Sequence, residues 1–319
     1  MVSLHDIVTA QSLLRGIAVR TPLLEWTGVT AKRRLFLKLE NLQPIGAFKL
    51  RGAYNKVASL SEEERRRGVI SYSSGNHGQG VAYAARALGV KAVIVMPGNA
   101  PKNKLESTAA LGAEVITVGP GSEERRLRAE QLAAEHGYAI VPPYNDEKII
   151  AGQGTVGLEI LEDMPEVETV LVPVGGGGLI SGVSAAIKLT NPAINMIGVE
   201  PDLAGDARAS LHSGHIVTFA AEQVTQTLAD GLRTQSIGEV NFEHIRAYVD
   251  EIVSVKEDEI REATRVLSAN PKTIAEPSGA VSVAAFMFHS SELPRTRNNV
   301  AVISGGNIDP AFLAEIRAG

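Results

Sequence analysis

Short apolar runs rich in valine and isoleucine alternate with amphipathic stretches along most of the chain, and this alternation limits the folds that the sequence can adopt. The stretches with helical character lie between the apolar runs, as at residues 79–88, 102–111 and 123–136. Strands that are apolar throughout are buried on both faces, and their alternation with helices is typical of parallel sheets covered by helices. We therefore predict an α/β protein built on open twisted sheets. The predicted strands are residues 35–40, 69–72, 92–96, 115–118, 170–174, 197–199 and 300–303.

The chain length favours two cores, because 319 residues is long for a single compact one. No linker rich in proline or glycine divides the sequence, so the two parts are predicted to be interwoven. Three strand–helix units within residues 68–145 would form a small mobile domain that closes on a substrate. Residues 1–67 and 146–319 would form a larger domain, into which the small one is inserted.

The composition excludes several kinds of chemistry. The absence of cysteine rules out disulfides, thiolate zinc sites, iron–sulfur clusters and a cysteine nucleophile. A net charge of −5 gives no reason to expect nucleic acid or an acidic membrane as a partner. The N-terminus lacks the pattern of a secretory signal, and no apolar stretch approaches the roughly 20 residues that span a bilayer. We expect a cytoplasmic protein.

Four consecutive glycines follow a predicted strand and precede a predicted helix; they are Gly175, Gly176, Gly177 and Gly178. A loop without Cβ atoms lets successive N–H groups point at one anion, and a helix N-terminus adds partial positive charge. A tight turn would also tolerate glycine, but four in a row weaken the chain more than a turn requires. The spacing matches neither the dinucleotide fingerprint nor the P-loop. The loop is therefore predicted to bind a phosphate of another kind of ligand.

Residues 47–57 are predicted to form a helix, and Lys49 lies near its start, between Phe48 and Leu50. A positive helix end and apolar neighbours both disfavour the ammonium form, so the pKa of Lys49 is expected to be lowered. A neutral amine is what a Schiff base with an aldehyde requires. Most lysines are solvated surface charges, so this position alone decides little.

Three further segments complete a pattern. They are S-S-G-N-H-G at residues 73–78, A-D-G at 229–231 and S-G-G-N at 304–307. Alone, the first would also fit a helix cap, and the last would also fit a turn after a strand. Together with the lysine and the glycine loop, in this order, they closely resemble the serine/threonine dehydratase and serine racemase family. The resemblance covers about residues 21–310 and implies a pyridoxal phosphate enzyme with the tryptophan synthase β-like fold.

The resemblance also implies roles for individual residues. Lys49 would form the Schiff base with the cofactor, Phe48 would pack beside its ring, and Asn76 would contact the ring hydroxyl. Gly175 to Gly178 would hold the phosphate, and Ser304 would meet the pyridine nitrogen. The loop that grips the substrate carboxylate would contain Ser73, Ser74, Asn76 and His77.

The implied reaction is an α,β-elimination that converts L-serine, L-threonine or a related β-hydroxy amino acid to a 2-oxo acid and ammonia. Freed Lys49 would remove the α-proton of the substrate. The hydroxyl of Ser304 would not keep the pyridine nitrogen charged as a carboxylate does, which favours prompt loss of the β-hydroxyl.

Two residues keep alternatives open. In the family, a serine at the position of Ser74 can return a proton to the face opposite the lysine, so serine or hydroxyaspartate racemisation is the second hypothesis. Arg125 lies where relatives place an arginine near the substrate. Its guanidinium could pair a second carboxylate, as in 3-hydroxyaspartate, so a 3-hydroxyaspartate dehydratase is a third hypothesis. Arg125 could equally be a solvated arginine on a highly charged helix.

The resemblance suggests a divalent cation as well. Glu200, Ala204 and Asp206 have the spacing at which serine racemases and some dehydratases bind metal. Two carboxylates and a backbone carbonyl are hard oxygen ligands that suit Mg²⁺, Ca²⁺ or Mn²⁺. These acidic residues could also simply be exposed.

Two other classes of function remain open at this point. The chain could bind pyridoxal phosphate without turning over amino acids, or it could catalyse β-replacement, as cysteine synthases of the same fold do. Homodimerisation is expected from the family resemblance alone.

Overall fold

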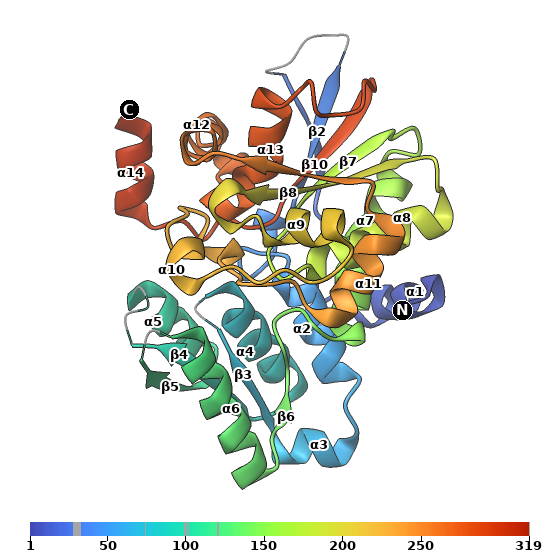
Figure 1. Ribbon diagram of the computed structural model, residues 1–319. Coiled ribbons are helices and arrows are strands. Elements are labelled where there is room, and N and C mark those ends of the chain that lie inside the picture. The colour runs from blue at the N-terminus through green and yellow to red at the C-terminus, as the bar shows by residue number, and fades with distance from the viewer. Residues whose placement is uncertain (28–32, 74, 99, 101, 120, 319) are drawn as a thin grey trace.

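The computed structural model describes residues 1–27, 33–73, 75–98, 100, 102–119 and 121–318. Two sheets occupy separate halves of the molecule, the larger in the upper half of Figure 1 and the smaller in the lower half. Helix α2 (Lys49–Ala58) packs against helices of both halves, α4 (Asn76–Leu88) and α7 (Glu147–Asp163). The predicted architecture of two helix-covered sheets is therefore confirmed.

The larger sheet has six strands in the order β1-β2-β10-β7-β8-β9. Strand β1 is antiparallel to β2, and the remaining pairs are parallel. One face packs on α12 (Glu257–Leu267) and α13 (Pro277–Phe288) through residues such as Leu37. The other packs on α7 and α8 (Gly178–Thr190) through residues such as Val172. Its strands are β1 (Leu23–Trp26), β2 (Arg34–Leu39), β7 (Thr169–Pro173), β8 (Asn195–Pro201), β9 (Glu251–Val255) and β10 (Asn298–Ile303).

The smaller sheet has four parallel strands in the order β5-β4-β3-β6. Ile94 belongs to the core on the α4 side, whereas its neighbour Val93 belongs to the core on the α6 side. This alternation explains why β4 reads as a continuous apolar run. The strands are β3 (Val69–Tyr72), β4 (Ala92–Pro97), β5 (Glu114–Val118) and β6 (Ala139–Ile140).

Helices cover both faces of the two sheets. The remaining α-helices are α1 (Leu4–Leu13), α3 (Glu62–Arg67), α5 (Lys102–Ala110), α6 (Ser122–His136), α8 (Gly178–Thr190), α9 (Asp206–Ser213), α10 (Ala221–Val224), α11 (Glu239–Tyr248), α12 (Glu257–Leu267), α13 (Pro277–Phe288) and α14 (Pro310–Ala318). Four short 3₁₀ helices are η1 (Glu40–Leu42), η2 (Asp202–Ala204), η3 (Asp230–Leu232) and η4 (Pro271–Thr273). Among the described residues, none of the helices combines the length and the apolar character that a membrane crossing requires.

Strands β1, β6 and β9 were not predicted, whereas the predicted elements differ from the observed ones mainly at their ends. Glu40 was expected in a strand but opens η1, where its carboxylate meets a buried arginine. The helix expected from residue 47 begins at Lys49, because Ala47 is paired with Gly305 and Phe48 N–H donates to Ser304 O. These pairings tie the start of α2 to the end of β10.

Candidate functional site

The site lies where parallel strands of both sheets end, which is where open α/β sheets bind their ligands. The loops after β3, β7 and β10 and the start of α2 surround one cavity of about 430 Å³. Ser74 lies outside the described residues, and the predicted metal ligands do not line the cavity. The other predicted site residues all do: Phe48, Lys49, Ser73, Asn76, His77, Arg125, Gly175, Gly176, Gly177, Gly178 and Ser304.

Lys49 presents its amine to this cavity. Its Nζ donates a hydrogen bond to Pro143 O at 2.8 Å and lies 5.1 Å from the centroid of the Phe48 ring. Burial lowers the pKa of Lys49 to about 8. The amine is therefore partly neutral near pH 7 and suited to attack a carbonyl carbon.

The glycine loop forms another wall of the cavity and leads into α8. Gly177 is the N-cap of α8 with φ +94°, and no side chain caps this helix. Its first amides can therefore serve an anion. A Cβ on Gly176 would overlap the ring of Tyr144, and one on Gly177 would lie 2.9 Å from Asn241 Cβ. Glycine is thus required for the backbone to lie against these neighbours.

Asn76 is held by polar groups from two other loops. Its Nδ2 donates to Glu276 Oε1 at 2.5 Å, and its Oδ1 accepts from Asn307 Nδ2 at 2.8 Å. A Cβ on Gly305 would overlap Glu276 Oε1, so the S-G-G-N segment needs glycine there to admit the carboxyl group. These contacts fix the orientation of the Asn76 amide at the edge of the cavity.

The ring of His77 is turned to the small sheet. Its Nε2 lies 3.0 Å from Val141 O, and a carbonyl can only accept, so Nε2 carries the proton. Burial, and then the charge of Lys49, lower the pKa of His77 to about 3, so the ring is neutral. Any contact of His77 with an anion therefore has to come from its backbone amide.

An ion pair crosses between the two halves of the molecule at the cavity. Lys104 Nζ on α5 lies 2.6 Å from Asp230 Oδ2 on η3. Burial and the nearby charge of Asp230 raise the pKa of Glu276, which also lines the cavity. The cavity thus holds a cluster of titratable groups besides Lys49.

Arg125 and its neighbour Arg126 differ in their surroundings. Arg126 pairs with Glu123 and Glu130 on its own helix, both at 2.5 Å. Arg125 is half-buried, and burial lowers the pKa of its guanidinium. The arginine named from the sequence therefore lines the cavity, and its contact with a substrate stays a prediction.

Glu200 and Asp206 are buried together beyond the cavity. Glu200 accepts hydrogen bonds from the amides of Ala207 and Arg208, and Asp206 Oδ2 has no partner among the described residues. Burial, and then the charge of Asp206, raise the pKa of Glu200 well above its ordinary value. Burial raises the pKa of Asp206 to about 7. The part of the chain that the structure describes contains no group of three or more acidic or histidine side chains that could hold a metal.

Sequence reasoning missed three lining residues that shape the site: Tyr144, Glu276 and Lys104. Glu276 stands before Pro277, a signal for the start of a helix that carries no hint of chemistry. Tyr144 and Lys104 have no local pattern that distinguishes them from surface residues. Their importance comes from pairings across the fold.

Comparisons with known proteins agree with this geometry. A family profile described as pyridoxal-phosphate dependent enzyme matches residues 14–305. A Thermotoga maritima protein named L-threonine ammonia-lyase is 48% identical over 322 residues, covering 99% of this chain and 78% of that protein. A protein of Escherichia coli K12 named L-threonine dehydratase catabolic TdcB is 41% identical, covering 99% of this chain and 96% of that protein. A solved structure of maize serine racemase is 36% identical with a TM-score of 0.93, covering 98% of this chain and 96% of that one.

Proposed function

This chain belongs to the pyridoxal-phosphate dependent enzyme family, and on that premise we propose that it is an ammonia-lyase converting L-threonine or L-serine to a 2-oxo acid and ammonia. Membership confirms the resemblance drawn from the five motifs, together with the fold and the cofactor that it implied. The relatives named for threonine deamination support the choice of reaction.

One observation carries the proposal: the amine of Lys49 and the uncapped start of α8 line the same cavity. Lys49 would bind the aldehyde end of pyridoxal phosphate, and Gly175 to Gly178 would bind its phosphate. Phe48 would flank the ring, Asn76 would meet its hydroxyl, and Ser304 would meet its nitrogen. When bound, the cofactor withdraws electrons from the α-carbon of an amino acid.

Lys49 would then act as the base. Once the substrate amine has taken its place on the cofactor, Lys49 Nζ, held near the cavity by Pro143 O, would take the proton from the substrate α-carbon. The ammonium so formed would give a proton to the β-hydroxyl, which leaves as water. The lowered pKa supports this role because a neutral amine is needed to accept a proton. Lys49→Ala would remove the base.

The start of α4 would bind the substrate carboxylate. Gly75 is the N-cap of this helix and no side chain caps it, so its first amides favour an anion. Ser73, Asn76 and the His77 backbone lie at this end. Ser74 completes the proposed carboxylate loop in the sequence.

Racemisation is the second candidate function. Two observations favour it: Ser74 occupies the position from which family members return a proton, and a serine racemase has 36% sequence identity to this chain. Arg125 at the cavity keeps 3-hydroxyaspartate among the candidate substrates.

Ammonia release from L-serine, D-serine, L-threonine and both 3-hydroxyaspartate isomers, with chiral analysis of the remaining amino acid, tests these functions. An ammonia-lyase releases ammonia fastest from L-threonine or L-serine, and Lys49→Ala releases none. If D-serine accumulates faster than pyruvate, racemisation is the main function and elimination the second. A yellow protein that releases no ammonia from any of the five substrates would indicate that the chain binds the cofactor without turning over amino acids.

A divalent cation, such as Mg²⁺, Ca²⁺ or Mn²⁺, is proposed at Glu200, Ala204 O and Asp206. The two carboxyl groups suit a cation because they are buried together and Asp206 Oδ2 lacks a partner among the described residues. The ion would neutralise their repulsion and stabilise the turn between β8 and α9. It would lie outside the cavity and take no part in proton transfer.

We propose further that residues 68–145 close on the substrate as a unit and that the protein is a homodimer. The ion pair between Lys104 and Asp230 supports closure, because it joins the two halves across the cavity. Dimerisation rests on the family alone, and sedimentation equilibrium tests it.

A further inference from the structure

The first turn of α2 carries two cations at its positive end, Lys49 and Arg51. This turn has no acidic residue, and Phe48 at the N-cap supplies no side-chain hydrogen bond. Cations at this end of a helix are unfavourable. Contacts from outside the helix must therefore hold the turn that carries the Lys49 amine.

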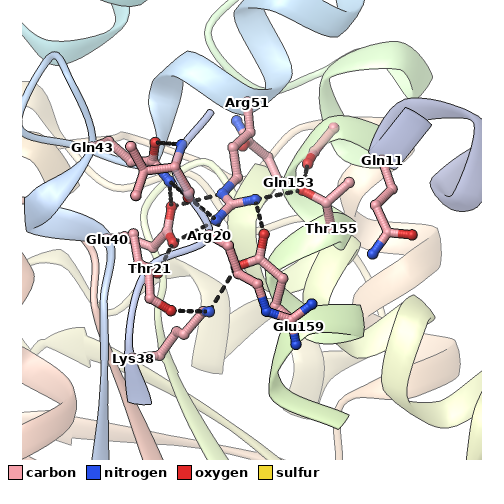
Figure 2. A network of polar contacts seen from close by, with 12 residues as sticks. Gln11, Arg20, Thr21, Lys38, Glu40, Gln43, Arg51, Gln153, Thr155 and Glu159 are labelled. Atoms are coloured by element: carbon pink, nitrogen blue, oxygen red, sulfur yellow. Dashed lines mark hydrogen bonds and ion pairs between the residues drawn. The ribbon is translucent and has the colours of Figure 1, made fainter. Parts of the chain in front are cut away.

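Arg51 supplies such contacts, and Figure 2 shows its guanidinium between two carboxylates. Its Nε and one Nη donate to the two oxygens of Glu40 at 2.8 and 2.9 Å. Its two Nη atoms also donate to the two oxygens of Glu159 at 2.7 and 2.9 Å. Arg51 is only 1% exposed. The guanidinium therefore joins α2 to η1 and to α7 by two bidentate pairs.

The network around Arg51 is buried and electrically balanced. Lys38 Nζ on β2 donates to Glu159 at 2.6 Å and to Thr21 O at 2.7 Å, so two cations meet two carboxylates. Thr21 Oγ1 and Gln43 Nε2 donate to Glu40 (Figure 2). Burial opposes ionisation of Glu40, but the Arg51 guanidinium outweighs it and holds the pKa of Glu40 below its ordinary value. Each of the four charged side chains therefore has a partner of opposite charge, and none is more than 8% exposed.

Close backbone packing leaves α2 little freedom around this network. A Cβ on Gly152 of α7 would lie 2.6 Å from Arg51 O. A Cβ on Gly80 of α4 would lie 3.1 Å from Lys49 O. The glycines set how closely α2 approaches α7 and α4, and the guanidinium fixes its position along them.

We propose that Arg51 is a positioning residue, whose paired contacts with Glu40 and Glu159 hold the first turn of α2 so that the Lys49 amine reaches the cofactor and substrate. This inference rests on the proposed role of Lys49. An arginine is required because its planar fork makes two bidentate pairs, whereas a lysine ammonium has only three donors on one atom.

The test compares the wild-type protein with Arg51→Lys, which keeps the charge, and with Ile160→Ala. Ile160 is buried on α7 beside Glu159, so its truncation lowers stability without removing a charge or a hydrogen bond of the network. The first readout is the rate at which added pyridoxal phosphate becomes attached to Lys49 in cofactor-free protein, trapped with borohydride and located by peptide mass. The second is kcat and KM for L-threonine.

Arg51→Lys is expected to slow attachment and lower kcat at least about tenfold with KM unchanged, because a displacement of about 1 Å can cost a hundredfold. Ile160→Ala is expected to retain both rates despite its lower melting temperature. The inference would be overturned if Arg51→Lys attached the cofactor and turned over L-threonine at wild-type rates. It would also be overturned if Ile160→Ala lost as much of both rates as Arg51→Lys. If Arg51→Lys does not fold, Glu40→Gln, which weakens one bidentate pair, is expected to slow attachment, and an unchanged rate would overturn the inference. A wild-type protein that attaches the cofactor at another lysine would instead overturn the proposed function.

Discussion

At the scale of single residues, the site depends on side chains whose surroundings change their ordinary chemistry. Burial lowers the pKa of Lys49 to about 8. Burial also keeps the ring of His77 neutral. A residue that ordinarily titrates near neutral pH therefore serves here as a hydrogen-bond donor to Val141 O. Glu276, which the sequence did not single out, orients Asn76 through one hydrogen bond. The chemistry of each group follows from what surrounds it rather than from its residue type.

The pKa of Lys49 predicts how cofactor attachment depends on pH. Only the neutral amine attacks an aldehyde, and one pH unit below a pKa about a tenth of the amine is neutral. The initial rate of attachment to cofactor-free protein should therefore rise as the pH rises through about 8 and then level off. Stopped-flow absorbance from pH 6 to 10 measures this rate. A rise centred near the ordinary lysine pKa would show that the amine is solvated.

At the scale of elements, the sequence located the strands after which the site loops follow, because β3, β7 and β10 each contain adjacent buried aliphatic residues. It did not predict β1, β6 or β9. Strand β6 has only two residues, and β1 and β9 are the edge strands of the larger sheet, each of which includes a glutamate. The glycine loop and Lys49 were recognisable because glycine runs and a lysine in an apolar setting are unusual. Glu276 was not recognisable from the sequence, because its partner Asn76 is 200 residues away and only folding brings the two together.

The glycine loop should not tolerate a side chain at position 176. In Gly176→Ala the new Cβ would overlap the ring of Tyr144, and such overpacking typically costs about 1–3 kcal/mol. The loop can relieve the clash only by moving, so the affinity for pyridoxal phosphate should fall as well. Equilibrium dialysis of the cofactor measures the loss. Gly121→Ala, whose Cβ would come no closer than 3.7 Å to the neighbours that the structure describes, is the control and should bind normally. Equal affinities in the two variants would contradict the phosphate role.

Removal of the buried guanidinium should destabilise the fold strongly. Arg51→Met removes the cation bonded to Glu40 and leaves Glu159 with Lys38 alone, and breaking a buried ion pair costs roughly 3–5 kcal/mol. Urea unfolding of the two proteins measures the difference in free energy of unfolding. Arg34→Met, which removes an exposed pair with Glu25, is the control and should cause little change. If Arg51→Met lowers the free energy of unfolding no more than Arg34→Met does, the network does not stabilise the fold.

At the scale of the whole molecule, the cavity exists because strands of two separate sheets end at the same place. α2 packs on both halves and carries Lys49, while the ion pair between Lys104 and Asp230 spans the opening. The cation proposed at Glu200, Ala204 and Asp206 would lie between the end of β8 and the start of α9, and neither carboxyl group lines the cavity. Its effect should therefore be on stability more than on chemistry.

Added Mg²⁺ should raise the melting temperature of the protein, and EDTA should lower it again. A ligand at a hundred times its dissociation constant stabilises by about 2.7 kcal/mol. Glu200→Gln should abolish the response, whereas Asp202→Asn, which alters an exposed residue of η2, should retain it. Differential scanning fluorimetry with Mg²⁺, Ca²⁺ and Mn²⁺ makes the comparison. A response that persists in Glu200→Gln would place the cation elsewhere.

The most direct measurement is a crystal structure of the protein grown with pyridoxal phosphate. We predict continuous density from Lys49 Nζ through the pyridine ring to a phosphate on the amides of residues 175–178. Phosphate bound at another place, or a cofactor joined to a different lysine, would contradict the assignment of this cavity as the active site.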